Sequence, residues 1–236
     1  MLNQFTRLIA AASTIAASLP AAYEGTDAAH AFEYAEAWND GDDGSISGNP
    51  DVFGQWFLGG EGEHLIGDST QVADGLGADI NQQGKAFRLR STDGNEADAF
   101  RFIDPVGLAP GQRFSVDLAV NYRGGSKGLV ARGDYPENPT LFRFEIGADD
   151  YRVSGAATGN GSISEYYANR TAFTVQFTQT SESGGRWEIR RRGELRETAS
   201  GTYRGVLRSI RFYNSGQGGT LEDDLYFNNL KVETPE

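Results

Sequence analysis

The chain has 236 residues, no cysteine, two histidines and a formal net charge of −12 at pH 7. The absence of cysteine excludes thiolate metal sites, redox motifs and cysteine nucleophiles, and two histidines leave little scope for zinc sites or Ser-His-Asp chemistry. An acidic surface repels the phosphates of nucleic acids and of anionic membranes, so we expect neither as a partner.

The first 31 residues have the features of an export signal. Residues 1–7 carry one positive charge, residues 8–22 are uncharged and rich in alanine, and Ala29, His30 and Ala31 give the small-x-small pattern that signal peptidase accepts. The apolar stretch is too short to anchor the chain in a bilayer. We therefore predict a signal over residues 1–31, with Ser18 and Ala22 as alternative cleavage points, and a secreted single domain over residues 32–236 that is not inserted in a membrane.

From residue 32 onward, apolar and polar residues alternate with a period of two. The pattern is clear in residues 114–120, 141–146, 173–178, 187–190 and 209–212, and further strands are expected at 52–58, 85–91, 97–103, 127–132 and 224–233. Turns such as Asp93-Gly94-Asn95 and Ala109-Pro110-Gly111 separate them. One apolar face per strand is typical of sheets wetted on one side. About a dozen strands at this spacing predict an all-β fold, a two-sheet antiparallel β-sandwich or jelly roll.

Several segments resemble strands of bacterial extracellular concanavalin A-like and laminin-G-like jelly rolls. They are Ile80-Asn81-Gln82-Gln83-Gly84-Lys85-Ala86-Phe87, the turn and strand Leu108-Ala109-Pro110-Gly111-Gln112-Arg113-Phe114, and Ile210-Arg211-Phe212-Tyr213 with Asp224-Leu225-Tyr226-Phe227-Asn228-Asn229-Leu230. None of them is a catalytic signature, so the resemblance implies a fold more than an activity. The family includes lectins, carbohydrate-binding modules, adhesion modules, glucanases and polysaccharide lyases.

The resemblance also implies a structural calcium ion, and no organic cofactor is expected. Phe32-Glu33 and the segment 226–229 are similar to the first and last strands of carbohydrate-binding sandwiches, in which an early Glu and a late Asp ligate calcium. The candidate ligands here are Glu33, Asp40 and Asn228, because calcium takes hard oxygen ligands. Asn228 stands in place of the usual Asp and removes one charge. A solvated acidic turn around Asp40 is the alternative.

The polar sides of the predicted strands supply candidate contacts for a glycan. Such faces bind sugars by stacking aromatic rings on them and by bonding their hydroxyls with charged or amide side chains. Trp38 is the candidate exposed ring, whereas Trp56 and Trp187 are in phase with apolar neighbours and are expected in the core. An ordinary solvent-facing sheet would contain similar arginine and glutamate pairs. The remaining candidates are Asp117, Asn121, Tyr122, Arg143, Glu145, Glu188 and Arg190.

A polysaccharide hydrolase or lyase is the alternative function. Glycoside hydrolysis needs two carboxylates roughly 5–10 Å apart, and the Glu-x-Asp-x-x-Glu pattern of jelly-roll glucanases does not occur. The segment Arg192-Gly193-Glu194-Leu195-Arg196 only loosely resembles an alginate-lyase strand, which leaves Asp117 with Glu145 or Glu188 as a carboxylate pair. We therefore favour a secreted non-catalytic module that recognises an extracellular polysaccharide or glycan. A matrix or surface protein that assembles through sheet edges is the third hypothesis.

Overall fold

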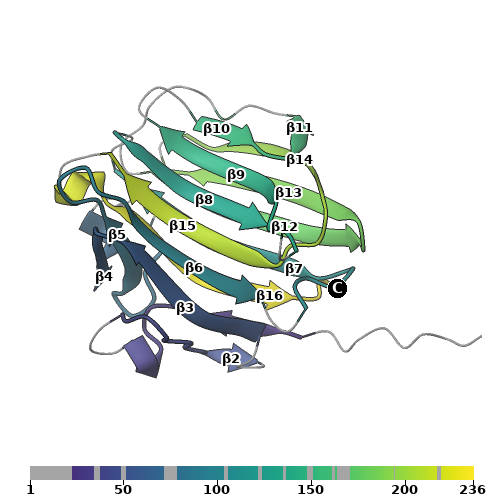
Figure 1. Ribbon diagram of the computed structural model, residues 1–236, viewed down its shortest axis with the longest axis horizontal. Helices are drawn as coiled ribbons and strands as arrows, with labels where there is room; N and C mark the ends of the chain where they lie inside the picture. The colour runs from purple at the N-terminus through teal and green to yellow at the C-terminus, as the bar shows by residue number, and fades with distance from the viewer. Residues whose placement is uncertain are drawn as a thin grey trace, which may run out of the picture.

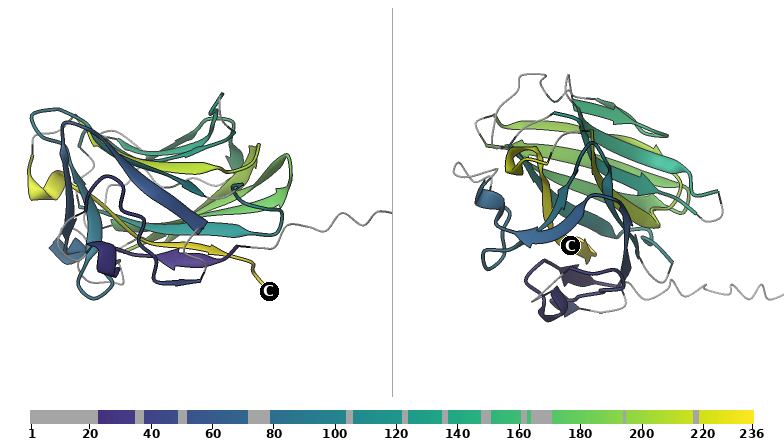
Figure 2. Two further views of the ribbon diagram at one scale, coloured as in Figure 1. Left: turned by 60° about the horizontal axis from the view of Figure 1, so that its bottom comes forward. Right: turned by 60° about the vertical axis from the view of Figure 1, so that its left-hand side comes forward.

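The structure is a computed structural model that describes residues 23–34, 38–48, 52–71, 79–103, 106–121, 124–134, 137–147, 151–160, 163, 171–193, 195–216 and 219–236. Within these residues the chain forms two antiparallel sheets that pack face to face, one in front of the other in Figure 1 and seen from two further sides in Figure 2. The predicted all-β sandwich is confirmed. No helix in these ranges is long and apolar enough to span a membrane.

The rear layer of Figure 1, sheet A, contains ten strands in the described part of the chain. They are β1 (Gly25–Asp27), β2 (Ser47–Gly48), β4 (Glu63–Gly67), β5 (Ala86–Arg90), β7 (Arg113–Val120), β11 (Thr158–Asn160), β12 (Thr171–Ser181), β13 (Gly184–Arg192), β14 (Glu197–Arg204) and β16 (Leu225–Glu233). Their order is β11-β14-β13-β12-β7-β16-β1-β2, with β5 beside the start of β16 and β4 beyond β5.

The front layer, sheet B, contains six strands in the same ranges. They are β3 (Phe53–Gly60), β6 (Ala97–Ile103), β8 (Ser126–Arg132), β9 (Thr140–Gly147), β10 (Tyr151–Ser154) and β15 (Ser209–Ser215), in the order β10-β9-β8-β15-β6-β3. Three short 3₁₀ helices complete the described elements: η1 (Phe32–Tyr34), η3 (Ser69–Gln71) and η4 (Leu221–Asp223). Every predicted strand overlaps one of the strands of the two sheets, whereas β1, β2, β4, β10, β11 and β14 were not predicted.

The core lies between the two sheets and is rich in aromatic rings. Alternation turns the apolar residues of each strand inward, so that Phe114, Val116 and Leu118 of β7 are almost completely buried. Phe212 of sheet B and Phe227 of sheet A stack with 3.9 Å between ring centroids. This stack joins the two layers at the centre of the sandwich.

Residues 25–34 are part of this fold. β1 pairs with β16, and the C-terminal strand lies beside the N-terminal one in Figure 2. Asp27 is 1% exposed. Its Oδ2 accepts hydrogen bonds from Arg101 Nη1 at 2.5 Å and from the Tyr34 hydroxyl at 2.9 Å. Burial raises the pKa of Asp27 to about 6, and the contact with Arg101 opposes that shift. Cleavage after Ala31 would remove β1 and Asp27, whereas cleavage after Ser18 or Ala22 would leave both in place.

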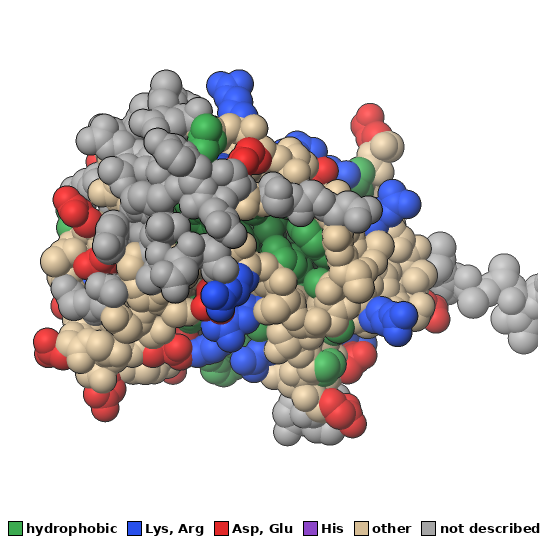
Figure 3. Space-filling view, turned by 90° about the horizontal axis from the view of Figure 1, so that it is seen from above, with side chains coloured by type: hydrophobic (Ala, Val, Ile, Leu, Met, Phe, Trp, Pro, Cys, Tyr) green, Lys and Arg blue, Asp and Glu red, His purple; other side chains and the backbone are tan. Residues whose placement is uncertain are grey.

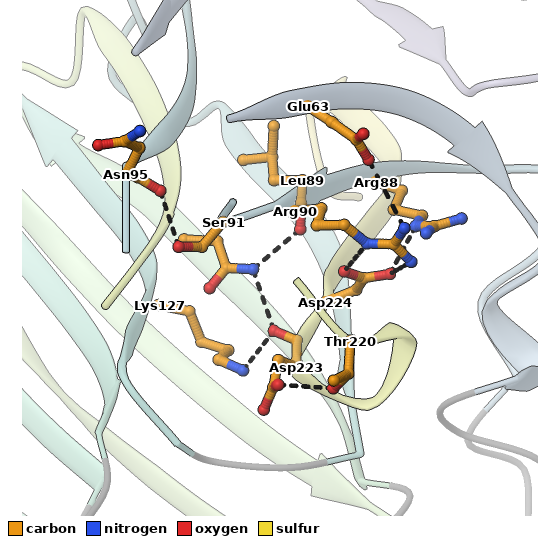
Figure 4. A network of polar contacts seen from close by, with 11 residues as sticks. Glu63, Arg88, Leu89, Arg90, Ser91, Asn95, Lys127, Thr220, Asp223 and Asp224 are labelled. Carbon is orange, nitrogen blue, oxygen red and sulfur yellow. Dashed lines mark hydrogen bonds and ion pairs between the residues drawn. The ribbon is translucent and has the colours of Figure 1, made fainter. Parts of the chain in front are cut away.

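A second buried network of charged groups crosses between the sheets at the end that holds η4 (Figure 4). The carboxylate of Asp224 accepts hydrogen bonds from Arg88 Nε at 2.6 Å and from Arg90 Nε and Nη2 at 3.0 Å each. Lys127 of β8 donates to the backbone carbonyl of Asp223 at 2.6 Å. Burial lowers the pKa of Lys127 to about 8. These contacts fasten the turn before β16 to both layers.

Candidate functional site

The outward side chains of sheet A form a regular grid of polar groups. Successive side chains of a strand point to opposite faces, so the residues between the core positions face outward. The strand register then sets which of them are neighbours across β7, β12, β13 and β14. The rows are Arg113-Thr178-Arg186-Thr202, Ser115-Gln176-Glu188-Ser200 and Asp117-Thr174-Arg190-Thr198.

Two adjacent hollows lie on this grid, with volumes of about 380 Å³ and 510 Å³. Arg190 borders both. Arg113, Gln176 and Ser200 are among the residues that line the first hollow, and Arg196 is among those that line the second. We call these two hollows together the arginine groove. Because the groove is built on paired strands, its side chains are held on a rigid base.

The arginine groove is positively charged although the chain carries a net charge of −12. Six arginines and two glutamates line its two hollows. Glu188 pairs with Arg190, and Glu197 pairs with the buried Arg191 at 3.0 Å. Basic side chains also lie on the face that Figure 3 shows, where one group of Lys and Arg is near the middle and others lie at the edge beside Asp and Glu.

A third hollow of about 410 Å³ lies on the same side of the sandwich, where β1 and β16 meet. His30, Lys231 and Asp117 are among its lining residues. Asp117 connects it to the arginine groove, because its Oδ1 accepts a hydrogen bond from Thr174 Oγ1 at 2.5 Å and forms an ion pair with Arg192 Nη2 at 3.0 Å. The other oxygen of Asp117 accepts from Asn229 Nδ2 at 2.9 Å. The three hollows therefore follow one face of the molecule.

The structure divides the predicted glycan contacts between two faces. Asp117, Glu188 and Arg190 lie together on the outer face of sheet A. Arg143 and Glu145 lie on β9 of sheet B, on the opposite side of the sandwich, where they form an ion pair at 3.1 Å. These five candidate residues therefore do not form one shared site. Asn121 directly follows β7, and Tyr122 lies outside the described residues.

The expectation that Trp38 is an exposed stacking ring is also wrong. Its side chain is 4% exposed and lies 4.9 Å from Phe87 and 5.5 Å from Trp56 between ring centroids. The reason is that the segment after Trp38 runs beside β3: the Gly41 amide donates to the Trp56 carbonyl, and the Trp56 amide donates to the Asp42 carbonyl. This pairing turns Trp38 into the core. Trp56 and Trp187 are buried as predicted.

The predicted calcium ligands are engaged in other contacts or lie at the surface. Asn228 is fully buried; its Oδ1 accepts from the Ala29 amide at 2.9 Å, and its Nδ2 donates to the carbonyls of Ile80 and Lys85. Asp40 accepts from the Leu58 amide, and Glu33 is exposed in η1. Among the described residues, no three His, Asp or Glu side chains converge as a metal site. Calcium binding stays a prediction.

The carboxylate pairs named for hydrolysis are far apart or engaged. Asp117 and Glu145 belong to opposite faces. Asp117 and Glu188 are two strands and one row apart, which corresponds to about 12 Å between their Cα atoms at ordinary strand spacing. Each of these two carboxylates is also paired with an arginine, Arg192 and Arg190 respectively.

Several groove residues were not predicted, although a signal for some of them exists in the sequence. Arg186 and Arg192 are in phase with Glu188 and Arg190 along β13, so the same alternation places them on the outer face. Ser200 was missed because β14 was not predicted: apart from Tyr203, its inward positions hold no large apolar residue that would mark a strand. The basic character of the face becomes visible only when neighbouring strands are aligned.

No family model matches the chain, and neither does any curated protein. Similar solved structures include the alginate lyase AlgAT5 from polysaccharide lyase family 7, with 13% sequence identity and a TM-score of 0.40 over 67% of this chain and 82% of that one. A Bacillus subtilis protein of unknown function with a galectin-like fold has 10% identity and a TM-score of 0.39, over 76% and 89% of the two chains. Lectin I-B4 from Griffonia simplicifolia, in its metal-free form, has 10% identity and a TM-score of 0.34, over 77% and 93%. The jelly-roll sandwich itself rests on the strand pairing described above.

Proposed function

We propose that this protein is a secreted, non-catalytic module that binds an extracellular glycan in the arginine groove. The observation that carries the proposal is the composition of the groove: amide and hydroxyl side chains such as Gln176, Thr178 and Ser200 alternate with guanidinium groups over two adjacent hollows. These groups can donate to and accept from sugar hydroxyls. Held on strands, they lose little conformational entropy when a ligand binds.

The absence of a suitable carboxylate pair among the described candidates supports binding rather than cleavage. Asp117 is already engaged by hydrogen bonds from Thr174 and Asn229 and by an ion pair with Arg192. We therefore expect no new reducing ends when the protein is incubated with polysaccharides that it binds. Release of reducing ends by the pure protein would contradict the non-catalytic assignment.

A glycan array, run with and without a calcium chelator, tests the binding proposal. Glycans that bind the unaltered protein are then titrated against the double variant Gln176→Ala/Ser200→Ala, which removes an amide and a hydroxyl from the first hollow without altering the core. We expect an affinity loss of about thirtyfold, because two hydrogen bonds of about 1 kcal/mol each are lost.

The matched control is Thr140→Ala/Ser154→Ala, which removes two exposed hydroxyls from sheet B. This variant should bind as the unaltered protein does. Equal losses in both double variants, or binding to no glycan with or without chelator, would refute the proposed site.

A further inference from the structure

We propose that the glycan is an acidic polysaccharide, whose carboxylate or sulfate groups pair with the arginines of the arginine groove. The inference rests on the proposed function and adds the chemical class of the ligand. Three observations on the described residues support it: guanidinium groups that have no carboxylate partner among them, the lack of a stacking ring among their outward side chains, and the spacing of the arginines.

Some guanidinium groups of the groove are not paired with a carboxylate of the described residues. Arg190 and Arg192 pair with Glu188 and Asp117. Arg186 and Arg196 are exposed and form no ion pair with any other residue that the structure describes. Guanidinium forms two parallel hydrogen bonds to one carboxylate or to two oxygens of one sulfate, so these two side chains are open to an anionic ligand.

The groove offers no aromatic platform for a neutral sugar. In the described residues of β7, β12, β13 and β14, the outward positions hold Arg, Thr, Ser, Gln, Glu, Asp and Ala. Trp187 borders the first hollow but is 4% exposed, and its ring packs on Phe142 in the core. Because stacking is a main source of affinity for neutral sugars, a ligand of this groove depends on its charges instead.

The arginines are spaced for separate charges along a polymer. Along β13, Arg186 and Arg190 are four residues apart, which corresponds to about 13 Å, and Arg113 lies two strands from Arg186, at about 10 Å. A polysaccharide with an anionic group on every sugar or every second sugar can reach several of them at once. Its hydroxyls then meet Thr178, Gln176 and Ser200 between the arginines.

Nucleic acid and anionic membranes fit these observations less well. Both present a dense array of phosphates that the net charge of −12 repels outside the groove. Single-stranded nucleic acids also bind by stacking their bases on aromatic side chains, which this face does not present in its described strands. A polymer with sparser charges and many hydroxyls suits the groove better.

Calorimetric titrations of the full protein test the inference, with polygalacturonate as the carboxylate probe, chondroitin sulfate as the sulfate probe and dextran as the neutral probe. A single-stranded oligonucleotide and vesicles that contain phosphatidylserine complete the set. We expect at least one acidic polysaccharide to bind more tightly than dextran, the oligonucleotide and the vesicles, with an affinity that falls as salt is added. In Arg186→Gln/Arg190→Gln, this affinity should fall by about tenfold or more, because two charge-assisted contacts are lost.

The matched control is Arg143→Gln on the opposite face. Arg143 and Arg190 each pair with a glutamate two residues away on the same strand, so both substitutions remove one paired arginine from an outer face. Arg143→Gln should bind as the unaltered protein does, and Arg190→Gln should be weaker. Binding of a neutral glycan that Gln176→Ala/Ser200→Ala weakens, but that neither salt nor Arg186→Gln/Arg190→Gln weakens, would overturn this inference and leave the proposed function intact. Tighter binding of the oligonucleotide or the vesicles would overturn the inference, and binding of no glycan would remove both proposals.

Discussion

Lys127 shows how a single buried charge links the stability of this protein to pH. Its ammonium group is fully buried and donates to the carbonyl of Asp223. Burial lowers the pKa of Lys127 from 10.5 to about 8, and the negative charges of Asp223 and Asp224 limit the shift. Between these two pH values the unfolded chain binds a proton at this residue that the folded protein does not.

Stability should therefore rise with pH over this interval. The contribution of the lowered Lys127 pKa to the free energy of unfolding is fully present above about pH 10.5 and is lost as the pH falls through about 8. We expect the free energy of unfolding of the unaltered protein to increase relative to that of Lys127→Met by about 3 kcal/mol between these limits, at about 1.4 kcal/mol per pKa unit. Urea unfolding of both proteins at several pH values measures this. Parallel pH profiles would show that Lys127 has an ordinary pKa.

At the scale of elements, strands could be predicted where apolar and polar residues alternate. β14 was not predicted, because glycine stands where an inward apolar side chain would be expected. β7 and β12 were predicted because Phe, Val and Leu mark their inner faces. In β14 the inner position opposite Trp187 is Gly201, where a Cβ would lie 2.7 Å from the Trp187 ring. The indole fills the space that an apolar side chain of β14 would occupy, so the strand carries a weak pattern.

Only part of the candidate site could be predicted, because the sequence pattern shows which side chains face outward but not how the strands pair. A period of two shows that Asp117, Arg143 and Arg190 face outward, but it does not assign a strand to one sheet or the other. That assignment depends on pairing between distant segments, which places Arg143 in sheet B and the other two in sheet A. The buried position of Trp38 depends on the same kind of long-range pairing.

The place of β1 in the fold leads to a prediction about processing at the N-terminus. A chain that starts at residue 32 lacks β1 and leaves Arg101 in the core without the carboxylate of Asp27. We expect it to be less stable than a chain that starts at residue 23 by about 3–5 kcal/mol or more, since an unpaired buried charge alone costs that much. N-terminal sequencing of the exported protein should accordingly find a cut at or before Ala22. Equal stability of the two chains would contradict this expectation.

At the scale of the whole molecule, the two outer faces differ in how their charges are arranged. On sheet B, Arg143, Arg208 and Arg211 each pair with a carboxylate. On sheet A, Arg186 and Arg196 have no such partner among the described residues. An acidic protein thus carries a basic surface on sheet A, and the paired arginines of sheet B serve as an internal control.

The shared core predicts a single unfolding transition. Phe212 and Phe227 stack across the layers, and the network around Lys127 and Asp224 crosses between them at one end. Neither sheet therefore has a separate core. Thermal unfolding followed by near- and far-ultraviolet circular dichroism should give coincident curves. Two separated transitions would show that the sheets unfold independently.

The position of β16 also governs when the sandwich can close. This strand is formed by residues 225–233, yet it lies between β7 and β1 and bonds to both. Until β16 has been synthesised, β1 can pair only with the two-residue strand β2. The core beside β7 and β1 then lacks the side chains of Phe227 and Leu230. The shared core of the two sheets therefore cannot be completed until the last residues of the chain have been synthesised.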